Sequence, residues 1–293
     1  MSVYTLIENS LTFAGKPLVP ALNAIGDLVG YIAPNYWSFL NRGFGKYNAD
    51  NFTDVIYKNF WLHSIYCTIF FSSLFLFIPK LITFYASKWH DSIDDKKKKE
   101  LPAYIVCMFH HVVIVPWSIK SIYDDWYHRN NDIHLFHDYR TTETSVVPIL
   151  IGYLMGDLFC SAIPTMQWEY IIHHIITLYL TIQGCFAIPP YTARFIAHLL
   201  ICDSTQLTFN TAWLLRLTPY QNHPIVTILE LSFLCFFILF RVINMPLCFL
   251  VQMQHGAAIG MGLARFTFLP LTLMQFFWMF KVVQGVQKKM KQV

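Results

Sequence analysis

Residues 169–188 read EYIIHHIITLYLTIQGCFAI, an apolar run interrupted by two adjacent histidines, His173 and His174. About 20 residues of apolar helix are needed to cross the hydrocarbon core of a bilayer, so the length of this run predicts a membrane-spanning helix. Ionisable side chains are costly inside such a helix and usually face the interior of a bundle. Consecutive helical residues point about 100° apart, so at least one of the two histidines faces inward. The run therefore predicts an all-α membrane protein with a polar interior.

The composition of the whole chain agrees with this prediction. Of the 293 residues, 55% are hydrophobic and only 13% are charged, whereas charged residues make up about a quarter of a soluble domain. The formal net charge of +4 is too small and too scattered to indicate nucleic-acid binding. The seven cysteines all fall within apolar segments, which predicts buried free thiols rather than a disulfide framework.

Seven apolar stretches are long enough to cross a bilayer, so we expect a multipass bundle of about seven transmembrane helices around a central polar or lipid-filled cavity. The predicted spans are Phe60–Tyr85, Leu101–Tyr123, Val146–Met166, Glu169–Ile188, Thr192–Leu215, Ile225–Val251 and Ala258–Val283. They form a transmembrane domain over residues 58–285. Residues 1–57 form an N-terminal extension, either an amphipathic helix at the membrane surface or a segment that docks on a partner. Residues 286–293 form a basic tail.

The lysines predict the orientation of the bundle. Seven spans place the run Lys96–Lys99 on the same side as the tail lysines Lys288, Lys289 and Lys291. The positive-inside rule makes that side cytoplasmic. The lysine spacing of the tail is similar to that of dilysine retrieval signals, which favours the endoplasmic reticulum. The mitochondrial inner membrane or another organelle remains an alternative.

Polar residues recur inside the predicted spans, and five helices contribute an ionisable group. Such a set fits a partly hydrated cavity better than lipid-facing positions. Asp157 and Asp203 are carboxylates at mid-span depth, and a carboxylate–imidazole pair either orients a general base or nucleophile or forms a buried polar lock. The candidate cavity residues are His110, His111, Asp157, His173, His174, Arg194, Asp203, Asn210, Trp213, Arg241 and Asn244.

A metal centre is the obvious alternative for a chain with twelve histidines. Membrane di-iron enzymes carry HxxHH boxes at the cytoplasmic helix ends, and none of the histidine clusters has that pattern. The topology also places His134 and His137 on the opposite side of the membrane from His173 and His174. We therefore predict no metal site.

Several motifs together resemble the TLC-domain family, which includes the ceramide synthases. The motifs are the run from Tyr153 to Leu158, the pair His173-His174, the segment from Arg194 through Asp203-Ser204 to Asn210 and Trp213, and the run from Phe240 to Pro246. His110 or His111 matches a further family histidine. The resemblance covers about residues 60–285. Around Ile201–Thr205 the pattern looks more like the branch outside the ceramide synthases.

The resemblance implies a bundle of six or seven helices around a cavity that fits an acyl chain. In the ceramide synthases the paired histidines transfer an acyl group from acyl-CoA to a sphingoid amine. Here that role would fall to His173 and His174, with Asp203 or Asp157 orienting them. No further cofactor is implied, and a phospholipid or sphingolipid is the expected bound molecule.

Three functions are therefore hypotheses. The first is a protein that binds or senses lipid acyl chains and influences membrane lipid composition. The second is an acyl-CoA-dependent N-acyltransferase of ceramide synthase type. The third is a structural accessory subunit of a larger membrane complex, with residues 1–57 and the loop 124–145 contacting other subunits.

Overall fold

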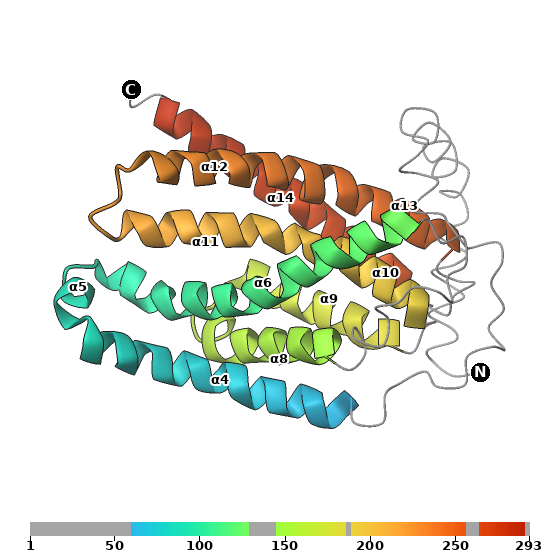
Figure 1. Cartoon of the computed structure of the whole chain (residues 1–293), viewed down its shortest axis with the longest axis horizontal. Helices are drawn as coiled ribbons and strands as arrows, with labels where there is room; N and C mark the ends of the chain where they lie inside the picture. The colour runs from blue at the N-terminus through green and yellow to red at the C-terminus, as the bar shows by residue number, and fades with distance from the viewer. Residues whose placement is uncertain (1–59, 129–144, 186–188, 256–263, 291–293) are drawn as a thin grey trace.

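The computed structural model describes residues 60–128, 145–185, 189–255 and 264–290, and every regular element in these ranges is helical (Figure 1). The α-helices are α4 (Phe60–Tyr85), α5 (Ser87–Asp91), α6 (Asp95–His128), α8 (Val147–Asp157), α9 (Trp168–Cys185), α10 (Pro189–Leu200), α11 (Ser204–Arg216), α12 (Pro224–Phe236), α13 (Met245–His255) and α14 (Ala264–Met290). The predicted extension 1–57 and most of the loop 124–145 lie outside the described residues.

Three segments of altered helical geometry join these helices into longer paths. A π-helix, η5 (Leu158–Ala162), continues α8, and a second π-helix, η7 (Phe237–Asn244), joins α12 to α13. A 3₁₀ turn, η6 (Ile201–Asp203), joins α10 to α11. These segments change the number of residues per turn and so redirect the side chains within and after them.

Four helices are long and apolar enough to cross a membrane, and a fifth apolar helix is shorter. The four are Phe60–Tyr85, Asp95–Asp124, Pro224–Gln254 and Arg265–Gln287, and the shorter one is Val147–Ala162. Large apolar side chains point outward along them; Phe77, for example, is 57% exposed and Leu231 59% exposed. Outward apolar side chains suit a lipid environment. The prediction of an all-helical membrane protein is confirmed, whereas the count of seven spans stays a prediction.

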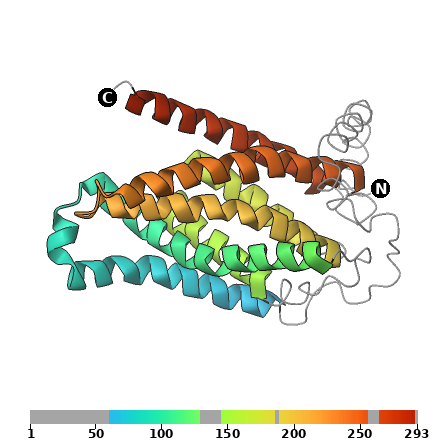
Figure 2. The ribbon, with the colours of Figure 1, turned by 45° about the horizontal axis from the view of Figure 1, so that its top comes forward.

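Two glycines bring α4 and α8 close together. A Cβ atom added to Gly152 would collide with the backbone and Cβ of Cys67, and one added to Gly156 would lie 3.1 Å from Phe71 Cβ. Small residues let helix backbones approach and gain van der Waals contact, which is the main attraction between helices in lipid. Figure 2 shows α4 on one side of the bundle and α14 on the opposite side, with the other long helices between them.

The helix ends near α5 are tied together by polar contacts. Trp89 Nε1 in α5 donates a hydrogen bond to the carbonyl of Leu217 at 2.6 Å. Leu217 comes directly after α11, so this bond joins the α4–α6 connection to the α11–α12 connection. Beside it, Arg216 and Glu230 form an ion pair between α11 and α12. This end of the bundle therefore has fixed connections.

Candidate functional site: a polar pocket inside the bundle

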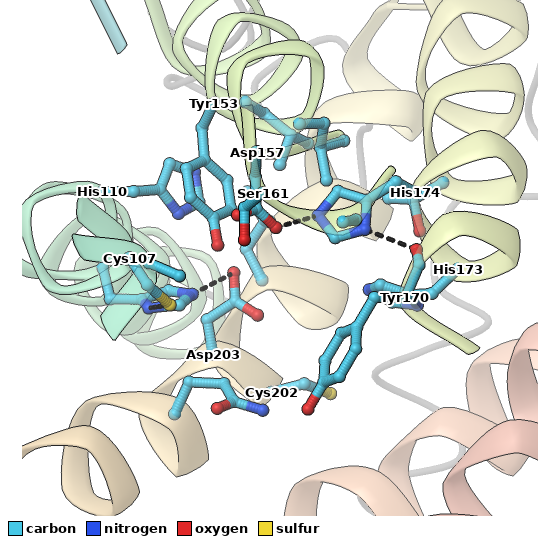
Figure 3. A pocket seen from close by; sticks show the side chains of 18 of the residues that line it. Cys107, His110, Tyr153, Asp157, Ser161, Tyr170, His173, His174, Cys202 and Asp203 are labelled. Atoms are coloured by element: carbon cyan, nitrogen blue, oxygen red, sulfur yellow. Dashed lines mark hydrogen bonds and ion pairs between the residues drawn. The ribbon is translucent and has the colours of Figure 1, made fainter. Parts of the chain in front are cut away.

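A pocket of about 360 Å³ lies among α6, α8, α9, α10–α11, η7 and α14, within the size range typical of ligand sites. Its lining runs along α6 from Lys99 and Glu100 to His110 and His111. Twelve helical residues correspond to about 18 Å, so the pocket is long enough to reach from near the start of α6 to the middle of the bundle. Figure 3 shows the histidines, carboxylates and tyrosines that meet in its middle part.

His174 and Asp157 form the tightest ionisable contact of the pocket. His174 Nε2 in α9 lies 2.8 Å from Asp157 Oδ2 at the end of α8, and His174 Nδ1 lies 2.6 Å from the carbonyl of Tyr170 (Figure 3). A carbonyl only accepts, so Nδ1 carries a proton. An Nε2···Oδ2 hydrogen bond then requires one further proton, held by the ring or by the carboxyl. The pair is therefore a buried imidazole–carboxyl contact that joins α9 to the end of α8.

A second imidazole–carboxylate contact lies across the pocket. His111 Nε2 in α6 is 3.5 Å from Asp203 Oδ2 in η6. The other ring nitrogen, Nδ1, lies 3.1 Å from the sulfur of Cys107, one helical turn earlier. The ring of His111 thus connects a thiol to a carboxylate, with both partners in the pocket lining.

Arg241 supplies a buried positive charge in the middle of the pocket. Its Nη2 lies 3.9 Å from Asp203 Oδ1, its Nε donates to Thr205 Oγ1 at 2.7 Å, and its Nη1 donates to Gln275 Oε1 at 2.9 Å. The residue is 5% exposed. A buried charge is stable only when it is paired and hydrogen-bonded, and these three contacts meet that need. They also join η7 to η6, α11 and α14.

Two histidines of the lining keep ring nitrogens unpaired. Neither ring nitrogen of His110, and not Nδ1 of His173, has a hydrogen-bond partner among the described residues. The His110 ring stacks on Tyr153 with centroids 4.2 Å apart, and His173 packs edge-on against Trp278 at 5.2 Å. Buried polar atoms normally have partners. Unpaired ones that line a pocket are available to a bound molecule.

Asp157, Asp203 and Arg241 each lie in or next to a segment of altered helical geometry. Asp157 directly precedes the π-helix η5, Asp203 ends the 3₁₀ turn η6, and Arg241 lies in the π-helix η7. A π-helical turn often occurs at functional sites because it redirects side chains without breaking the helix. The three irregular segments and the three charges thus coincide.

The pocket brings together most of the residues that the sequence singled out. Its lining includes His110, His111, Asp157, His173, His174, Asp203, Asn210 and Arg241. Three others lie outside this lining: Arg194 is buried in α10, Asn244 donates to the carbonyl of His198 at 2.7 Å, and the Trp213 ring stacks on Tyr104 at 3.9 Å. The predicted roles of all eleven stay predictions.

Cys107, Tyr170 and Gln275 also line the pocket, although they were not among the residues predicted from the sequence. Cys107 is four residues before His111, so helical spacing places both on one face. Gln275 is a polar residue within an apolar span, which was a usable signal. Tyr170 contacts His174 through its backbone carbonyl. A pattern of side chains in the sequence does not predict such a contact.

A group of three possible metal ligands also lies here. One ligand atom each from His110, His111 and Asp203 can be chosen such that all three lie within 4.8 Å of one another. The guanidinium of Arg241 beside Asp203 opposes a cation at this place. The sequence prediction of no metal stays a prediction.

The helices and the pocket define a helical membrane protein with a polar interior site. Comparison with family models identifies its class: residues 100–284 match the TLC domain. This match covers well over half of the chain, so the protein belongs to the TLC-domain family, as the sequence motifs predicted. No curated protein and no solved structure matches the chain.

Proposed function

We propose that this protein binds a lipid acyl chain in the interior pocket and thereby influences membrane lipid composition. The observation that carries the proposal is the order of side chains along the pocket. Lys99 and Glu100 lie in the first two turns of α6, and Gln167 directly precedes α9, at the α5 side of the bundle. The histidines and carboxylates lie about two to three helical turns further in. The pocket is therefore polar at one end and charged in the middle.

The far end of the pocket is lined mainly by apolar side chains, with Thr181 beside them. Leu150 near the start of α8, Leu180 near the end of α9, and Ile196 and Leu199 in α10 line it. Consecutive helices here are antiparallel, so all four residues lie on the same side of the carboxylates and histidines, about 6 to 10 Å further along their helices. A polar entrance, a charged middle and an apolar far end match a molecule with a polar head and an acyl tail, since apolar surface is favourably removed from water.

A lipid-binding measurement on filled-pocket variants tests this proposal. The full chain is purified in mild detergent, and bound lipids are extracted and identified by mass spectrometry. We expect wild type to retain a lipid at near-stoichiometric amounts and Leu199→Trp to lose most of it, because the indole occupies the acyl end. Leu231→Trp, on the outward apolar face of α12, is the matched control and should retain it. Equal lipid in all three proteins, or none in wild type, contradicts the proposal.

Acyl transfer from acyl-CoA to a sphingoid amine is the second candidate function. The observation that favours it is the His174–Asp157 pair beside His173, whose Nδ1 is unpaired. A histidine with an unpaired ring nitrogen, next to a buried imidazole–carboxyl pair, is suited to take a proton from an attacking amine. We place the protein in the branch of the family outside the ceramide synthases, so lipid binding without transfer stands first.

An amide-formation assay separates the two candidates. Purified protein in lipid nanodiscs is incubated with a labelled acyl-CoA and a sphingoid base. Labelled amide from wild type, lost in His173→Ala and His174→Ala but kept in His223→Ala at the α12 end, would establish the transferase. Lipid binding without amide formation leaves the first proposal.

The proposal also includes an orientation in the membrane and an organelle. A bundle of seven spans with its lysine-rich end in the cytoplasm would place Lys99 and the pocket entrance at the cytoplasmic face of the endoplasmic reticulum. The accessory-subunit hypothesis rests on residues 1–57 and is tested by co-purification of a stoichiometric complex that is lost when those residues are deleted.

A further inference from the structure

We propose that Cys107 is a nucleophile, activated by His111 and Asp203, that accepts an acyl group from a thioester donor. The three residues form a linear array: Cys107 Sγ lies 3.1 Å from His111 Nδ1, and His111 Nε2 lies 3.5 Å from Asp203 Oδ2. A thiol, an imidazole that contacts it, and a third group that orients the imidazole are the parts of an activated cysteine nucleophile.

One tautomer of His111 meets the needs of this assignment. A carboxylate only accepts, so in this tautomer Nε2 of His111 carries the proton and faces Asp203. In a neutral ring Nδ1 is then the acceptor, and it faces the thiol of Cys107. A base aimed at the thiol converts it to the thiolate, which is the reactive form. Arg241 Nη2, 3.9 Å from Asp203 Oδ1, balances the carboxylate that holds the ring.

The array lies where a ligand would reach it. Cys107 is partly buried and, with His111 and Asp203, lines the pocket. Beside them lies His110, which is 1% exposed and has no hydrogen-bond partner for either ring nitrogen among the described residues. A buried imidazole without a partner, facing a pocket, indicates a polar group of a ligand at this depth.

The entrance suits a donor whose leaving group is anionic. Lys99 lines the pocket eight residues before Cys107, about 12 Å away along α6. It ends the run Lys96–Lys99, whose positive charges attract phosphate groups. An acyl thioester of coenzyme A has phosphates at one end, an acyl chain at the other and the reactive carbonyl between them.

A single metal ion does not explain the same geometry. Cys107 and Asp203 contact opposite nitrogens of the His111 ring. A ring nitrogen binds an ion along its own lone pair, so one ion at His111 could be shared with the carboxylate or with the thiol but not with both. The array is therefore organised for proton transfer along the ring rather than for joint coordination.

The proposed step is a transthioesterification. The S–H proton of Cys107 moves to His111 Nδ1, and the thiolate attacks the carbonyl carbon of the donor thioester. The bond between that carbon and the donor sulfur breaks, and the leaving thiolate takes the proton from Nδ1. The products are an S-acyl Cys107 and a free thiol; no electron is gained or lost, and no oxidant is needed.

Acyl labelling of the full chain tests this inference. Purified protein in nanodiscs is incubated with palmitoyl-CoA that carries a terminal alkyne, and the labelled peptide is identified by mass spectrometry. We expect the label on Cys107, its release by neutral hydroxylamine and its loss in Cys107→Ala and Cys107→Ser. Cys160→Ala, a partly buried free cysteine outside the pocket lining, should keep it. His111→Gln should slow labelling by about 100-fold, the low end of a general base's contribution.

The outcomes are distinguishable from those of the proposed function, on which this inference rests for acyl-chain entry. Lipid retained without covalent label overturns the role of Cys107 and leaves lipid binding intact. Neither lipid nor label overturns both. Label that persists in Cys107→Ala, or that lies on a histidine, also overturns the assignment. N-ethylmaleimide provides a second readout on the native fold: it should modify Cys107 much faster in wild type than in His111→Gln, and equal rates contradict activation.

Discussion

His174 Nε2 lies 2.8 Å from Asp157 Oδ2, while His174 Nδ1 contacts the carbonyl of Tyr170 at 2.6 Å. The ring is thus fixed at both nitrogens, one partner on its own helix and the other on α8. This arrangement links α8 to α9 and places an imidazole–carboxyl contact at the pocket wall. The structural and the chemical roles of the pair respond differently to substitution.

Replacing Asp157 by asparagine separates these two roles. With Nδ1 protonated, Nε2 accepts a hydrogen bond from the new amide, so Asp157→Asn should unfold near the wild-type temperature and yet lack the shared proton. Asp157→Ala leaves the imidazole unpaired and should cost about 1–3 kcal/mol. Thermal unfolding in detergent measures both variants. Equal destabilisation by asparagine and alanine would contradict the proton assignment.

Arg241 should be the most costly of the pocket residues to remove. Arg241→Met leaves Asp203 without its cation and removes the hydrogen bonds that Arg241 donates to Gln275 and Thr205. Breaking a buried charge pair costs about 3–5 kcal/mol, so a large drop in unfolding temperature is expected. Lys281→Met is the control, because its pair with Glu169 is half exposed, and exposed pairs contribute about 0–1 kcal/mol. Similar losses in the two variants would show that Arg241 is not a structural centre.

The contact between α4 and α8 should be too close for a methyl group at Gly152. Gly152→Ala would place a Cβ atom against the Cys67 backbone, so the helices must separate and the protein should lose stability. Cys67→Gly should fail to rescue it, because backbone atoms take part in the clash. Gly285→Ala meets nothing within 4 Å and should gain up to about 1 kcal/mol from helix propensity. Denaturation in detergent compares these three variants with wild type, and an unaffected Gly152→Ala would contradict the packing.

The α5 end of the bundle depends on one indole hydrogen bond. Trp89→Phe keeps the aromatic ring but removes the donor to Leu217, so we expect a loss of about 1 kcal/mol. The same change should raise protease sensitivity in the α11–α12 connection, which limited proteolysis measures. Trp61→Phe, on the outward face of α4, is the control for loss of an indole as such. Unchanged cleavage in Trp89→Phe would count against the coupling of the two connections.

Hydrophobic run length predicted the helices well, because lipid requires long apolar helices with internally satisfied backbones. The run Phe60–Tyr85 matches α4 at both ends. Within the predicted span Val146–Met166, the helix changes to π-helical geometry after Asp157. The length of an apolar run does not predict such a change. Run length does not predict where a helix ends, because helix ends depend on local contacts. The basic tail was expected to begin at residue 286, whereas α14 runs to Met290.

The histidines and carboxylates of the pocket were predictable because their cost in an apolar segment demands an inward position. Their pairing was not. Either Asp157 or Asp203 could have served His174, and only the packing of α8 against α9 assigns Asp157 to it. Cys107 resembles an apolar residue in a composition count and was therefore not singled out, although its four-residue spacing from His111 places both on one helix face.

The π-helix η7 has a consequence for how this chain is aligned with others. A π turn contains one residue more than an α turn, so Phe237–Asn244 acts like a built-in insertion. Restoring ordinary α-helical winding with every residue kept would rotate the rest of the helix by about 100°, whereas losing one residue at the same time would leave the rest of the helix in place. An aligned sequence of equal length that lacks the π turn could therefore keep an arginine yet direct it at lipid. At this place an alignment gap carries more meaning than a substitution.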